Sequence, residues 1–79
     1  MKPPEYVLKD DIDLYVKELR LAGYDPRVHP GEIWVKGWLG SSPGISLVQR
    51  TDGHWVPVSH AVMRFEDARR VADQVEIPK

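Results

Sequence analysis

Apolar residues recur at helical spacing near the start of the chain. They fall on one face of a helix with 3.6 residues per turn, at Ile12, Tyr15, Val16, Leu19 and Ala22. We expect this helix to cover about residues 10–22. Asp10 or Asp11 should cap its first turn, and Gly23 fits the left-handed conformation that ends many helices.

A second stretch with helical spacing lies near the end of the chain. We expect it to begin between residues 61 and 66 and to run to about Val75. Glu66 and Asp67 place negative charge in its first turn, where the helix dipole favours it. The expected packing face comprises Phe65, Ala68, Val71, Ala72 and Val75.

Between the two helices the pattern alternates with a period of two, as in half-buried β-strands. We expect strands at about residues 32–39, 45–51 and 54–59, and either a short strand or a loop at 27–29. The sequence Asp52-Gly53 favours a tight hairpin between the last two strands. The order α-β-β-β-α indicates an α+β fold, with an antiparallel sheet of three or four strands and both helices packed on one face.

A two-residue turn at Asp52-Gly53 decides which hairpin side chains share a face. It sets Arg50 opposite Trp55 and Leu47 opposite Val58, and the more aliphatic face should lie beneath the helices. That core face comprises Ile33, Val35, Leu39, Ile45, Leu47, Gln49, Val56 and Val58. The open face carries Trp34, Lys36, Trp38, Arg50 and Trp55.

These five residues of the open face form the candidate partner-binding site. Tryptophan and arginine are the residue types most enriched at the energetic centres of protein interfaces. An exposed apolar patch of this kind usually marks a site for a partner. We expect Trp34, Trp38 and Trp55 to act as anchors, with Lys36 and Arg50 as polar contacts.

Length and charge narrow the class of protein. The chain has 79 residues, which suits one small domain (1–79) with an extended lead-in at 1–8 and a tail at 76–79. Eleven basic against twelve acidic residues give a formal net charge of −1, which argues against a dedicated binder of nucleic acid or anionic membranes. We find neither a membrane-spanning apolar stretch nor a signal-peptide pattern, and expect a cytoplasmic protein.

Residues that could carry catalysis or bind metal do not form a recognisable constellation. Cysteine is absent, which excludes disulfides and thiolate chemistry. His54 and His60 would stand roughly 20 Å apart on one strand, too far to share a metal ion, and His29 lies near a turn. We therefore expect no enzyme activity, no metal and no cofactor.

The element order over about residues 10–75 resembles the double-stranded RNA-binding fold. That resemblance implies RNA binding through lysines at the start of the second helix, where this chain has Glu66 and Asp67. Residues 18–24 and 56–60 look similar to parts of the HicA-like mRNA interferases, which use the same fold. Their catalytic histidine follows a Gly-Ser pair, whereas Gly40-Ser41 is followed here by Ser42.

We interpret the chain as a small non-enzymatic protein-binding module that occupies a larger protein through an open, tryptophan-rich sheet face. Inhibitors carried by phages or mobile elements fit this description. The alternatives are RNA binding on a double-stranded-RNA-binding-like fold, and a HicA-like mRNA interferase that lacks the usual histidine. A homodimer formed through the tryptophan face is a further alternative.

Overall fold

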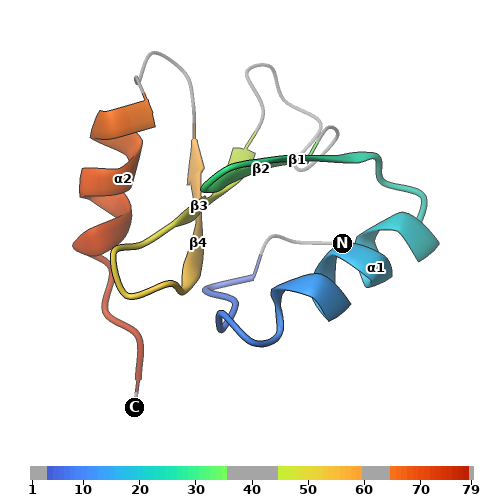
Figure 1. Ribbon diagram of the computed structural model, residues 1–79, viewed down its shortest axis with the longest axis horizontal. Coiled ribbons are helices and arrows are strands. Elements are labelled where there is room, and N and C mark those ends of the chain that lie inside the picture. Colours follow the sequence, from blue (N-terminus) through green and yellow to red (C-terminus); the bar gives the residue numbers. More distant parts are fainter. Residues whose placement is uncertain (1–3, 36–44, 60–64, 79) are drawn as a thin grey trace.

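The computed structural model describes residues 4–35, 45–59 and 65–78 of the chain. Its elements are α1 (Ile12–Leu21), β1 (Pro26–His29), β2 (Glu32–Val35), β3 (Ile45–Gln49), β4 (Trp55–Ser59) and α2 (Phe65–Asp73). The strands form one antiparallel sheet in the order β1-β2-β3-β4, and both helices pack against it (Figure 1). The predicted α+β fold is confirmed, and the segment before the first long strand supplies the fourth strand.

α1 ends as its sequence indicates but begins differently. Asp11 occupies the N-cap position, yet its side chain makes no capping hydrogen bond, contrary to expectation. At the other end Gly23 has a φ of 94°, which costs glycine nothing. The N–H of Tyr24 donates to the carbonyl of Leu19 at 3.0 Å, and the N–H of Gly23 donates to that of Arg20 at 3.1 Å. This pair of bonds is a Schellman motif, which satisfies carbonyls that the helix leaves open.

The β3–β4 hairpin has a register that differs from the predicted one. Gln49 pairs with Trp55, and the N–H of Arg50 donates to the carbonyl of His54 at 2.7 Å. Gly53, with a φ of 94°, donates its N–H to Arg50 at 3.0 Å. The connection is therefore a three-residue loop with a left-handed glycine, not a two-residue turn. This one-residue shift moves every side chain of β4 to the other face relative to β3.

The shifted register gives the sheet two buried faces, one beneath each helix. The face toward α1 (the α1 face) carries Ile33, Val35, Ile45, Leu47 and Trp55, which pack with Val16 and Leu19 of α1. The face toward α2 (the α2 face) carries Val48, Val56 and Val58, which pack with Ala68 and Ala72 of α2. Figure 1 shows the two helices on opposite sides of β4. The expectation that both helices share one face is corrected, because neighbouring residues of β3 and β4 are buried in different cores.

α2 packs against the sheet through part of its expected face. Ala68 and Ala72 are fully buried, but Val71 is exposed because it lies at the flank of that face. The helix ends at Asp73, and Val75 beyond it still packs against the core of the α2 face.

The lead-in is extended at Val7, which forms a bridge with Trp55 on the outer edge of β4. The N–H of Val7 donates to the carbonyl of Trp55 at 2.7 Å, and the N–H of Trp55 donates to Val7 at 2.8 Å. Both residues are buried in the core of the α1 face. Part of the lead-in therefore belongs to the core.

Proline occupies outward positions on both edges of the sheet. The two-residue turn between β1 and β2 directs the main-chain groups of Pro26 and Val28 away from β2. Of these two residues, only Val28 has an N–H to donate. On β4, Pro57 occupies the outward position that follows Trp55. Prolines at such positions discourage another strand from adding to the sheet.

Among the described residues, no helix has both the length and the apolar character needed to cross a membrane.

Candidate functional site

Trp34 is the most prominent exposed aromatic side chain among the described residues. It lies on the α2 face of β2, between its cross-strand partners Arg27 of β1 and Ser46 of β3. Its side chain is 54% exposed, because α2 packs against β3 and β4 and leaves the β1–β2 end of this face uncovered (Figure 1). The alternating pattern therefore indicates the outward direction of Trp34 correctly.

The indole of Trp34 is held in place from two sides. Its Nε1–H donates a hydrogen bond to Oε1 of Glu32, a residue buried to 8% exposure on the same face of the same strand. The ring of His29 lies against it, with centroids 5.3 Å apart and planes inclined by 56°. His29 pairs with Glu32 across the β1–β2 hairpin and so stands diagonally beside Trp34. The ring is thus fixed in position while about half of it faces solvent.

His29 and Glu32 belong to this site, although the sequence reasoning did not select them. The signal was present in the turn sequence Pro30-Gly31. Gly31 has a φ of 74°, and the two residues form a tight connection that pairs His29 with Glu32. A two-residue turn at Pro30-Gly31 pairs His29 with Glu32, and it therefore predicts both side chains on the face of Trp34.

The charge beside Trp34 is largely neutralised. Arg27 forms an ion pair with Asp25 at 3.0 Å, and both side chains are mostly exposed. Glu32, on the other side of the ring, accepts the indole N–H. These described groups, one positive and two negative, therefore give the surroundings of Trp34 no net positive charge.

Trp55 lies on the opposite face from Trp34. It is only 7% exposed and packs in the core of the α1 face with Leu47 and Ile33. Its indole Nε1 is buried and has no hydrogen-bond partner among the described residues. The prediction that Trp34 and Trp55 share one face of the sheet is wrong, since the hairpin register sends Trp55 to the other face and into the core.

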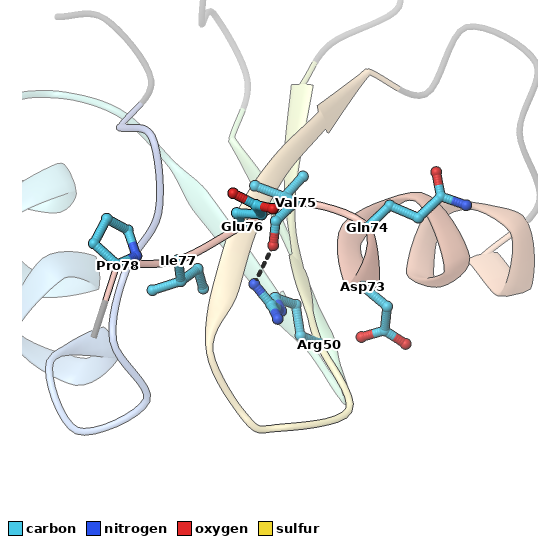
Figure 2. A pocket seen from close by; sticks show the side chains of 7 residues that line it. All are labelled: Arg50, Asp73, Gln74, Val75, Glu76, Ile77 and Pro78. Carbon is cyan, nitrogen blue, oxygen red and sulfur yellow. Dashed lines mark hydrogen bonds between the residues drawn. The ribbon is translucent and has the colours of Figure 1, made fainter.

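Arg50 joins the hairpin to the segment that follows α2. Its Nη1 donates to the carbonyl of Val75 (Figure 2). Its Nη2 pairs with the carboxylate of Asp52 at 3.2 Å. The side chain is mostly buried, and its guanidinium is engaged by Val75 and Asp52. Its role in the structure is to hold the end of α2 against the β3–β4 hairpin.

A second tie runs from the same hairpin to α2. The carboxylate of Asp73 accepts the main-chain N–H of Thr51 at 2.8 Å and the Thr51 hydroxyl at 2.7 Å. These two hydrogen bonds stabilise the ionised carboxylate and hold the pKa of Asp73 below its ordinary value.

A pocket lies beside these contacts between the β3–β4 hairpin and the end of α2, and its volume is about 630 Å³. Figure 2 shows its lining, which comprises Arg50, Asp73, Gln74, Val75, Glu76, Ile77 and Pro78. The guanidinium of Arg50 and the carboxylate of Asp73 are both engaged by neighbours within the chain. We interpret the pocket as a gap beside a structural contact.

The remaining candidates fall into two groups. Lys36, Trp38 and His60 lie outside the described residues. His54 is described: its Nδ1 accepts the main-chain N–H of Lys9 at 3.1 Å, which ties the lead-in to the hairpin. Within residues 4–35, 45–59 and 65–78 the structure holds no group of three or more side chains that could bind a metal ion.

No family model matches the chain, and neither a curated protein nor a solved structure was found to match it.

Proposed function

We propose that this chain is a non-enzymatic protein-binding module whose contact surface is centred on Trp34. The observation that carries the proposal is that the indole is 54% exposed and yet fixed by Glu32 and His29. Inhibitors carried by phages or mobile elements act in this way, by occupying the surface of a larger protein.

A fixed aromatic ring is a favourable anchor for a protein partner. Immobilising a free side chain on binding costs roughly 0.5–1.5 kcal/mol, and a ring already held in place avoids most of that cost. Tryptophan also presents a large apolar surface, and truncating such anchors commonly weakens binding by about 2 kcal/mol or more. The contacts with Glu32 and His29 therefore support a binding role for Trp34.

The position of Trp34 also suits contact with a folded partner. The β1–β2 hairpin forms one edge of the sheet and β4 lies toward the other edge (Figure 1). α2 packs against β3 and β4. Arg27 and His29 are exposed on the same face and can supply polar contacts at the rim of an interface.

The nucleic-acid alternative has less support around this residue. Proteins that stack bases on aromatic rings place them in a positively charged groove. Here Arg27 is paired with Asp25, and Glu32 stands beneath the indole. We therefore adopt the protein-binding function and keep nucleic-acid binding as an outcome that experiment can reveal.

The test is affinity capture from extracts of the source cells with the wild-type chain, Trp34→Ala and Val28→Ala. Val28 is a matched control because it is 57% exposed on the same hairpin but points to the opposite face. We expect a protein retained by the wild type and by Val28→Ala but lost with Trp34→Ala. Equal retention by all three chains would contradict the proposal, as would a nuclease-sensitive capture.

A further inference from the structure

The solvent side of α1 carries two large apolar side chains. Leu14 is 59% exposed and Leu21 is 79% exposed, whereas Val16 and Leu19 of the same helix are buried. Leu14 and Leu21 are two turns apart, so they lie within about 20° of each other around the helix and roughly 10 Å apart along it. They form a short apolar stripe that faces away from the sheet, which we call the α1 stripe.

Two opposite charges flank the α1 stripe. Lys17 and Glu18 lie between the two leucines along the helix, at about 50° on either side of the stripe. Both side chains are exposed. Throughout the described part of the chain neither has an ion-pair partner. Within the described residues, the stripe is thus bordered by one positive and one negative group that form no ion pair.

We infer that a second copy of this chain covers the α1 stripe, with the two α1 helices side by side and parallel. A two-fold axis parallel to the helices brings each leucine against its counterpart. The same axis places Lys17 of one copy opposite Glu18 of the other, on both flanks of the contact. An antiparallel pair would instead set lysine beside lysine and glutamate beside glutamate, which is unfavourable.

The size of the contact implies a weak dimer. α1 has ten residues and is about 15 Å long, so two such helices bury far less than the roughly 1,200 Å² of total surface that stable interfaces reach. α1 covers one face of the sheet and Trp34 lies on the other. The dimer therefore leaves Trp34 exposed on both copies, and the inference stands independently of the proposed function.

The test is sedimentation velocity over a range from about 10 µM to about 1 mM, where a weak dimer forms. We expect the average mass of the wild type to rise above 9.1 kDa toward twice that value as the concentration increases. Leu21→Ala and Leu14→Ala should each weaken dimerisation at least tenfold, and both should fold because their side chains are exposed. Leu8→Ala, which changes an exposed leucine outside α1, is the control and should dimerise normally.

Charge reversal tests the parallel arrangement separately. Lys17→Glu and Glu18→Lys should each weaken the dimer, because each sets like charges against one another on both flanks. The double variant Lys17→Glu/Glu18→Lys should restore it, since the opposite charges face each other again. A monomer at all concentrations, a dimer indifferent to Leu21→Ala, or a dimer lost with Trp34→Ala would overturn the inference.

Discussion

Trp34 and Trp55 lie on opposite faces of the same sheet, the first half exposed and the second buried. One extra residue in the β3–β4 loop produces this arrangement, because it reverses the faces of β4 relative to β3. The same shift gives each helix a sheet face of its own.

The two tryptophans should therefore respond differently to truncation. Trp55→Ala removes a buried ring from the core of the α1 face and should lower the free energy of unfolding by about 3–5 kcal/mol. Trp34→Ala removes an exposed ring and one hydrogen bond, and should cost about 1 kcal/mol or less. Urea denaturation followed by circular dichroism measures both. Similar losses for the two variants would contradict the described register.

Gly53 tests the hairpin loop directly. Its φ of 94° is unfavourable for any side chain, so Gly53→Ala should destabilise the protein by roughly 1–2 kcal/mol. The added Cβ would also lie 3.2 Å from Cδ of Lys9, a flexible chain that can move aside. Gly23→Ala is the matched control, because it has the same φ and meets nothing within 4 Å. Thermal unfolding of both should show a loss for Gly53→Ala at least as large as for Gly23→Ala.

Asp73 should make stability depend on acid pH. Its folded pKa lies below the ordinary value of 3.8, because Thr51 donates two hydrogen bonds to the ionised form. The contribution is therefore fully present above pH 3.8 and is lost as the pH falls through the lower folded pKa. Asp73→Asn should be less stable at neutral pH and should lose less stability on acidification. Denaturant titrations between neutral and acid pH measure the difference, and parallel curves for both proteins would refute this role.

The prolines at the sheet edges should limit association through strands. Pro26→Val and Pro57→Val each restore an outward N–H, on β1 and β4 respectively. We expect the double variant to aggregate more readily than the wild type. Adding Lys17→Glu, which weakens the proposed α1 dimer, should not prevent this aggregation. Light scattering at increasing concentration measures this. No change in scattering would show that the prolines are not what protects the edges.

Much of the fold could be predicted from local pattern, whereas the pairing of the strands could not. The face of α1 and its Gly23 stop follow from residue spacing and from glycine's freedom at positive φ. Asp52-Gly53, in contrast, is compatible with both a two-residue and a three-residue loop. The choice between them depends on burial: the longer loop places Trp55 in one core and Val56 in the other.

The residues of the candidate site also differ in how far the sequence could predict their positions. Trp34 could be identified from alternation along its own strand. Trp55 and Arg50 could not be placed, because their positions depend on a loop and on contacts with Val7 and Val75, distant in sequence. His29 could have been found from the turn at Pro30-Gly31.

In the proposed function, Trp34 anchors a protein partner. Isothermal titration of the purified, captured partner with the wild type, Trp34→Ala and Val28→Ala tests it most directly. We expect Trp34→Ala to weaken binding by about 30-fold or more, with Val28→Ala unchanged and only a modest effect of salt. Equal dissociation constants for the wild type and Trp34→Ala would contradict the claim.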